Sequence, residues 1–145
     1  MGATQFEAPQ WESVEWLESE TVGRLCVLDF EYPLAFPINY RMVRDGEAYQ
    51  LVFRAVTHSV VGRYVGPASL EVDQIDTSRR NAWSVIVRGE LRDAAGQADL
   101  PNTYPLLTEG RNRWKILDVV SISGRRFTSA TPAHGFSVDW QPVAT

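Results

Sequence analysis

The large apolar side chains of this chain recur at every second position, in short runs separated by turn residues. In PLAFPINYRM (33–42) they stand at Leu34, Phe36, Ile38, Tyr40 and Met42. Successive side chains of a strand point to opposite faces of a sheet, so this run predicts a strand with one apolar face. Pro37 lacks a backbone N–H donor and therefore predicts an edge strand or a place where the sheet opens.

Further runs of this kind complete the predicted elements. Strands are expected at 22–30, 47–54, 68–75, 82–91 and 114–122. Helices are expected at 9–19, where Trp11, Val14 and Leu17 lie three apart, at 57–64, and within the polar segment 94–108. Six strands in mainly hairpin order with a few short helices predict a mainly β protein, a closed or partly closed six-stranded antiparallel barrel.

Length and charge limit the classes of protein that this chain can represent. Its 145 residues predict one domain over 1–145, with 1–8 and 129–145 as peripheral tails. The net charge of −4 argues against a nucleic-acid partner. No apolar run approaches the ~20 residues that a membrane-spanning helix needs, so no membrane partner is expected.

The cysteine and the histidines predict a reducing compartment and no metal site. Cys26 is the only cysteine, so the chain can form no internal disulfide. The N-terminal segment has neither the basic nor the apolar region of a secretion signal, and a cytoplasmic protein is expected. His58, His134 and Cys26 stand too far apart in the sequence to give a metal-ligand spacing.

The aromatic content bears on assembly. The chain has 5 Trp, 5 Tyr and 6 Phe, which is generous for a barrel of this size. Large apolar flanks on a small protein mark surfaces that a partner covers. We therefore expect a homodimer.

The segment LVFRAVTHSV (51–60) gathers groups that bind anions. An apolar strand ends on Arg54, and Thr57, His58 and Ser59 then open a short helical pattern. A guanidinium, hydroxyl groups and the backbone N–H groups of a helix start are suited to a phosphate monoester. A surface arginine beside a helix cap gives the same pattern, so the segment alone leaves both interpretations open.

Five segments occur in an order and spacing that resemble one known family. They are WLESETVGRLCVLD, FPINYRMV, LVFRAVTHSV, SLEVDQIDTSRRNAWSVIVRGEL and SISGRRF. Together they resemble the FMN-binding split β-barrel family, the pyridoxamine 5′-phosphate oxidase-like proteins, in its small actinobacterial type. The resemblance runs from about Trp16 to Phe127. It implies a split-barrel homodimer with flavin mononucleotide (FMN) in each of two clefts at the interface.

The resemblance also implies which residues hold the cofactor. These are Ile38, Asn39 and Tyr40 along the isoalloxazine, Arg54, Ala55, Ser59 and Val60 at the ribityl-phosphate end, Trp83 and Ser84 facing the ring system, and Arg125 with Arg126 near the cofactor. Two positions depart from the family, which commonly has Lys where Val60 stands and Thr where Ala55 stands. Each lost contact would cost roughly 1.5–3 kcal/mol. Arg63, four residues after Ser59, is expected to lean back and compensate, and His58 to add a donor.

The sequence assigns no catalytic residue. It has no Ser–His–Asp arrangement and no P-loop, and Glu71 and Asp73, which share a strand face, are interpreted as surface carboxylates. A bound flavin would supply the redox chemistry itself. The leading interpretation is a flavin-dependent oxidoreductase of a small molecule, with a deazaflavin coenzyme as a variant. The alternative, favoured by Val60 and Ala55, is a non-catalytic flavin- or ligand-binding dimer.

Overall fold

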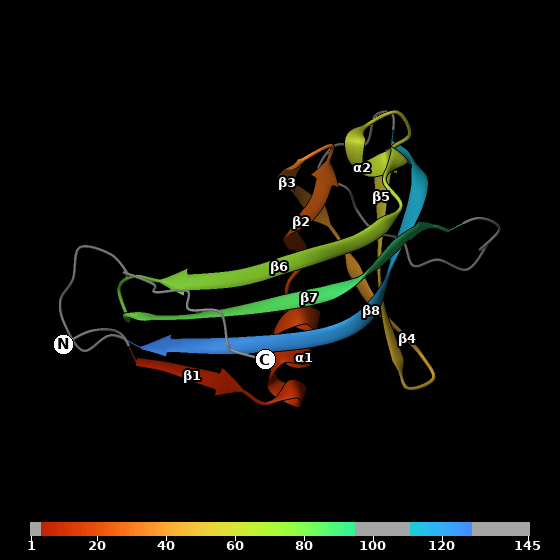
Figure 1. Cartoon of the computed structure of the whole chain (residues 1–145). Coiled ribbons are helices and arrows are strands. Elements are labelled where there is room, and N and C mark those ends of the chain that lie inside the picture. The colour runs from red at the N-terminus through yellow and green to blue at the C-terminus, as the bar shows by residue number, and fades with distance from the viewer. Residues whose placement is uncertain (1–3, 95–110, 129–145) are drawn as a thin grey trace.

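A computed structural model describes residues 4–94 and 111–128, which form one antiparallel sheet with two helices (Figure 1). The elements are β1 (Thr4–Ala8), α1 (Gln10–Ser19), β2 (Val22–Asp29), β3 (Tyr32–Asn39), β4 (Arg41–Asp45), β5 (Ala48–Val56), α2 (Val60–Arg63), β6 (Gly66–Asp76), β7 (Asn81–Asp93) and β8 (Arg111–Thr128). The strand order is β3-β2-β6-β7-β8-β5-β4, and β1 pairs with β8. The predicted class, a mainly β antiparallel split barrel, is confirmed, because the sheet curls while β3 and β4 remain its edges.

The described sheet has eight strands where six were predicted, and Tyr40 accounts for one of the two additions. Its backbone N–H donates to the carbonyl of Thr21 at 2.9 Å, and its hydroxyl donates to the carbonyl of Leu17 at 2.6 Å. These bonds divide the predicted strand 33–42 at Tyr40. β3 then pairs with β2, and β4 with β5. The edge position predicted from Pro37 is confirmed for β3.

The second additional strand is β1, which replaces part of the tail predicted over 1–8. β5 pairs with β8 only from Arg111 to Asp118, which leaves the later part of that edge of β8 without a strand. Thr4–Ala8 fills this place, opposite Thr128 to Gly124. The strand predicted over 114–122 accordingly continues to Thr128. The predicted helix within 94–108 and the tail 129–145 lie outside the described residues, apart from Ala94.

The core lies inside the curl of the sheet and is closed at one side by α1. Alternate residues of β2, β5, β6, β7 and β8 are buried there, as the period-2 pattern predicts, including Leu25, Phe53, Leu70, Val85, Val87 and Leu117. α1 buries Leu17 completely and stacks Trp16 on Trp83 of β7, with ring centroids 4.9 Å apart. Beyond the barrel, β6, β7 and β8 run on together as an arm that β1 widens (Figure 1). No helix among the described residues is long and apolar enough to span a membrane.

A charged cluster lies on the outer face of the barrel, on β2 and β6. One guanidinium nitrogen of Arg24 lies 2.8 Å from Glu71 Oε2 and 3.1 Å from Asp73 Oδ2. Burial and the neighbouring Asp73 carboxyl raise the pKa of Glu71 to about 7, although Arg24 acts in the opposite direction. Glu71 is therefore a partly desolvated group on the outer face rather than a fully solvated one.

This cluster predicts a pH dependence of stability. Since the folded-state pKa of Glu71 is about 7 and its ordinary value is 4.5, the folded state binds more protons between these values. The free energy of unfolding should fall as the pH rises through this window, and Glu71→Gln should flatten that fall. Urea unfolding from about pH 5 to about pH 8 measures both slopes. Asp45→Asn, at the exposed end of β4, is the control. Equal slopes in wild type and Glu71→Gln would contradict the assignment.

Candidate functional site

A pocket of about 150 Å³ lies where β3, β5 and the start of α2 meet. It is lined by Phe36, Pro37, Ile38, Arg54, Ala55, Val56, Ser59, Val60 and Val61. The predicted cofactor residues among these are Ile38, Arg54, Ala55, Ser59 and Val60. This cavity, hereafter the Arg54 pocket, is thus formed by two segments that the sequence places well apart, FPINY and LVFRAVTHSV.

Arg54 is the one charged side chain among the described residues that line the pocket. It lies opposite Trp114 of β8 in the ladder, and its guanidinium carbon is 5.4 Å from the centroid of the Trp114 ring. Such a cation–π contact uses the face of the guanidinium and fixes its plane, and the N–H donors lie in that plane. The other walls are mainly aliphatic and aromatic. The pocket therefore combines a single oriented cation with apolar surface.

Ser59 caps α2. Its Oγ accepts a hydrogen bond from the N–H of Gly62 at 3.0 Å and donates one to the carbonyl of Val56 at 2.7 Å. The N–H of Ser59 also donates to the Val56 carbonyl, at 3.0 Å. Since the hydroxyl proton is engaged with Val56, Ser59 shapes the pocket wall by fixing the turn between β5 and α2.

The two residues expected to compensate for the missing lysine lie outside the pocket lining. The Arg63 side chain folds back over α2, as its spacing predicts, and its Nε donates to the carbonyl of Ser59 at 3.4 Å. His58 is exposed in the turn before the helix. Val60 lines the pocket and packs against the core, and Ala55 is buried in the core cluster.

Of the three residues predicted to lie along the isoalloxazine, only Ile38 reaches this pocket. Tyr40 is buried, and burial raises the pKa of its phenol well above its usual range. Its hydroxyl holds the end of α1 through Leu17, as described above. Asn39 pairs with Val22 and lies on the opposite face of β3 from Ile38.

Trp83, Ser84 and Arg125 belong to the arm and not to the Arg54 pocket. Ser84 is buried and pairs with Asp73 on one side and Arg125 on the other. Trp83 points to the other face, against α1, and its Nε1 donates to Gln74 Oε1 at 3.3 Å. Arg125 and Trp114, the neighbour of Arg54, stand far apart along β8, at ~3.3 Å per residue. Within one chain the predicted residues thus form two separate groups.

Arg126, the other half of the predicted pair, is engaged with α1. It forms an ion pair with Glu12, and its guanidinium carbon lies 5.6 Å from the centroid of the Trp16 ring. The Trp16–Trp83 stack and Arg126 thereby fix α1 on the arm.

Lys115 is a residue near the pocket that the sequence reasoning did not select. Its side chain is completely buried on β8, and its ammonium lies beneath α2. The signal was present, because Lys115 is the only lysine of the chain and stands in the apolar run WKILDVV.

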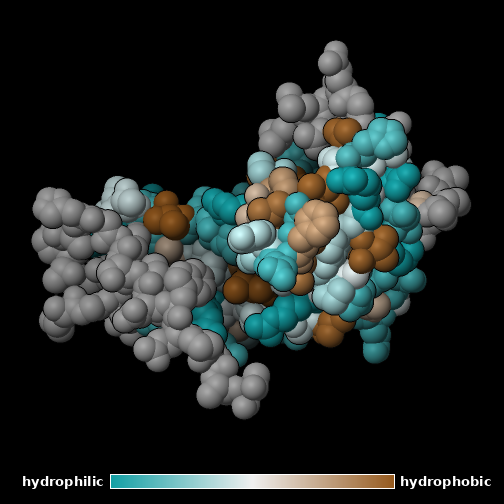
Figure 2. Space-filling view, turned by 45° about the horizontal axis from the view of Figure 1, so that its top comes forward, coloured by the Kyte–Doolittle hydropathy of each residue, from teal (hydrophilic) through white to brown (hydrophobic). Residues whose placement is uncertain are grey.

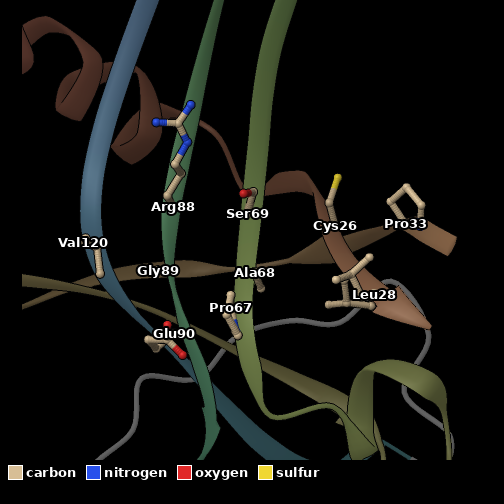
Figure 3. A pocket seen from close by; sticks show the side chains of 11 residues that line it. Cys26, Leu28, Pro33, Pro67, Ala68, Ser69, Arg88, Gly89, Glu90 and Val120 are labelled. Atoms are coloured by element: carbon tan, nitrogen blue, oxygen red, sulfur yellow. The ribbon is translucent and has the colours of Figure 1, made fainter. Parts of the chain in front are cut away.

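A second hollow, of about 380 Å³, lies on the outer face of the sheet (Figure 3). Its lining comes from β2, β3, β6, β7 and β8 and includes Cys26, Leu28, Ser69, Arg88 and Val120. Large apolar side chains are exposed on and beside it: Leu28 at 55%, Phe30 at 96%, Tyr32 at 71% and Val120 at 75%. Apolar side chains also gather on the face of the barrel that Figure 2 shows.

The family follows from a match over most of the chain. The model of the pyridoxamine 5′-phosphate oxidase family matches residues 9–131. The chain belongs to this family. Among curated proteins, none matches the sequence. β1 lies before the matched segment.

Solved structures of this fold resemble the chain over nearly their whole length. A conserved protein of unknown function from Corynebacterium diphtheriae has a TM-score of 0.73 and 26% identity, covering 86% of this chain and 98% of that one. An FAD-binding protein from Mycobacterium smegmatis has a TM-score of 0.65 and 25% identity, covering 86% and 99%. An FAD-binding protein from Mesorhizobium loti has a TM-score of 0.66 and 18% identity, covering 88% and 100%. The resemblance drawn from the sequence is confirmed.

Proposed function

We propose that this chain is a flavin-binding protein that holds the phosphate end of FMN in the Arg54 pocket and acts as an oxidoreductase of a small molecule in the cytoplasm. The observation that carries the proposal is the Arg54 guanidinium, fixed on Trp114 in a pocket with Ile38, Ala55, Ser59 and Val60. A charged donor in a partly apolar pocket strengthens a phosphate contact, since water screens it less. The FAD-binding proteins that share the fold add support for a flavin.

The proposed cofactor site is completed by a second copy of the chain. Trp83, Ser84 and Arg125 lie in the arm, away from the Arg54 pocket of the same chain, so a ligand at Arg54 would meet them only on a partner. The outer hollow, with Leu28, Val120 and other exposed apolar residues, gives that partner a surface to bury. In a two-chain site, Ser84 and Arg125, which share one face of the arm, would meet the same cofactor as the residues of the Arg54 pocket.

In this proposal the residues of the chain bind the flavin and orient it. When bound, the flavin supplies the hydride and electron chemistry. Arg54 holds the phosphate, the walls formed by Phe36, Ile38 and Val60 exclude water, and the capped turn at Ser59 keeps those walls in place. The described lining contains no carboxylate and no histidine, so no proton donor is assigned to this chain.

A second candidate is a binding protein without catalytic activity, and the charge of the pocket favours it. FMN ends in a phosphomonoester, which carries close to two negative charges at neutral pH. The pocket meets them with the single cation of Arg54, where the family commonly adds a lysine at position 60. FAD carries the same total charge on two bridging phosphates, so one guanidinium would face a single charge at the phosphate that it contacts. Titration with FMN, FAD and riboflavin measures which flavin the pocket prefers, and a flavin-loaded protein that turns over no electron donor or acceptor would identify the non-catalytic candidate.

The first test of the proposal is the flavin affinity of wild type and Arg54→Ala. The freshly purified protein should show or acquire a flavin absorption spectrum. Arg54→Ala should weaken FMN binding more than tenfold, since a charge-assisted contact contributes about 1.5–3 kcal/mol. Riboflavin, which has no phosphate, should bind both proteins alike. Arg44→Ala removes another guanidinium that lies over an aromatic ring, that of Tyr49, and should leave FMN binding unchanged. A colourless protein that ignores every flavin, or equal losses for FMN and riboflavin, would refute the proposal.

The departure at Val60 gives a gain-of-affinity prediction. Val60→Lys should place an ammonium in the Arg54 pocket and tighten FMN binding about tenfold, as one new charge-assisted contact of roughly 1.5 kcal/mol requires. Because Arg63 lies outside the lining, the gain should appear with Arg63 intact, and salt should reduce it. Val65→Lys adds the same charge at an exposed position beyond α2 and is the control. If Val60→Lys gives no gain in FMN affinity, even in an Arg63→Ala background, the proposed placement of the phosphate beside position 60 is wrong.

The two-chain site predicts a homodimer at micromolar concentration. Sedimentation should give twice the monomer mass, and Leu28→Glu, which puts a charge into the outer hollow, should shift the protein toward monomer. A wild type that remains monomeric would contradict the two-chain site while leaving the Arg54 pocket to be judged by its own variants.

A further inference from the structure

The Lys115 ammonium joins three segments of the chain. Its Nζ donates to the carbonyl of Gly62 at 3.3 Å, to the carbonyl of Tyr64 at 2.8 Å and to Asp93 Oδ1 at 2.7 Å. An ammonium has three donors, so these acceptors account for all of them. A completely buried charge is costly unless it is satisfied in this way. Lys115 therefore links β8 to the last turn of α2 and to the end of β7.

The carbonyls that Lys115 holds belong to the same compact turn that forms a wall of the Arg54 pocket. Gly62 lies so close to β5 that a Cβ there would stand 2.0 Å from the carbonyl oxygen of Val56. Ser59 ties the start of the turn to the same Val56 carbonyl. The segment from Thr57 to Tyr64 thus packs against the end of β5 and is held by the Lys115 ammonium at its own end.

A second cation contacts the same two residues, Gly62 and Asp93. The guanidinium of Arg113 lies 3.7 Å from Asp93 Oδ2 and donates to the Gly62 carbonyl at 3.4 Å. Two cations thus share one carboxylate, and the hydrogen bond from Lys115 together with both charges lowers the pKa of Asp93. Two cations and one carboxylate thus lie together beneath α2.

We propose that Lys115 is a positioning residue for the anionic end of the ligand: it holds α2 so that Val60, Ser59 and Arg54 keep the geometry that receives a phosphate. This rests on the proposed function for the identity of the ligand. Lys115 itself touches Gly62, Tyr64 and Asp93, so it acts through the turn. Loss of the ammonium removes the Lys115 hydrogen bond to the Tyr64 carbonyl and leaves the Gly62 carbonyl with Arg113 alone, which frees the turn to move away from Arg54.

The test uses Lys115→Met, which keeps the length of the side chain and removes its charge. Amide hydrogen exchange of the flavin-free protein should become at least tenfold faster at Gly62, Arg63 and Tyr64, whose N–H groups bond within the turn, and stay unchanged at Val85 and Val87. The preference for FMN over riboflavin should fall about tenfold, with riboflavin affinity retained. Leu117→Ala, at the next inward-facing position of β8, is the matched control. It should lower global stability without changing the FMN preference.

The outcomes separate this inference from the proposed function. If the wild type shows no preference for FMN over riboflavin, the assignment of Arg54 to a phosphate is wrong. The exchange rates would still show whether Lys115 positions α2. Wild-type exchange at Gly62 to Tyr64 in Lys115→Met would overturn the positioning role, as would an equal loss of both ligands. Should Lys115→Met fail to fold, Lys115→Gln decides, because glutamine is shorter, uncharged and has only two N–H donors for three acceptors. Wild-type exchange and preference in that variant would likewise overturn the inference.

Discussion

The ladder between β7 and β8 contains one bulge, and the separation of barrel and arm depends on it. The register shifts between Arg88 and Gly89, so that Val120 has no opposite residue. A Cβ at position 89 would stand 2.2 Å from the carbonyl oxygen of Asp118, so glycine alone permits this close approach. A bulge increases the local twist and bends its strand. The two strands can therefore close the barrel at one end and run out as the arm at the other.

β8 also connects the parts of the candidate site, because it crosses this bend. Before the bulge it supplies Trp114, which fixes the Arg54 guanidinium, and Lys115, which holds α2. Beyond the bulge it supplies Arg125 and pairs with β1. Because of the bend, one strand supports both the Arg54 pocket and the distant group that contains Arg125. Two such chains related by symmetry would bring unlike ends of β8 together, as the proposed two-chain site requires.

The sequence predicted what is local and left out what depends on distant partners. Alternation placed the strands and their buried faces, and the contiguous motif LVFRAVTHSV placed Arg54 beside the start of α2. The break at Tyr40 was not predictable, because the alternation runs through it and the break is made by hydrogen bonds to Thr21 and Leu17. β1 is short and weakly patterned, and only the vacant edge of β8 gives it a place. The burial of Lys115 likewise depends on acceptors at 62, 64 and 93.

The difference between local features and contacts of distant segments also applies to the charge at the candidate phosphate end. At position 60 the sequence shows a missing lysine, and neither Arg63 nor His58 enters the lining to replace it. The structure has instead a cationic group behind the pocket wall, where Lys115 and Arg113 share Asp93. Such a group acts on an anion at longer range than a direct contact, but in a medium of lower effective dielectric constant than water. For a phosphate held at Arg54, the support from this group would be weaker than that of a lysine in the pocket and less sensitive to salt.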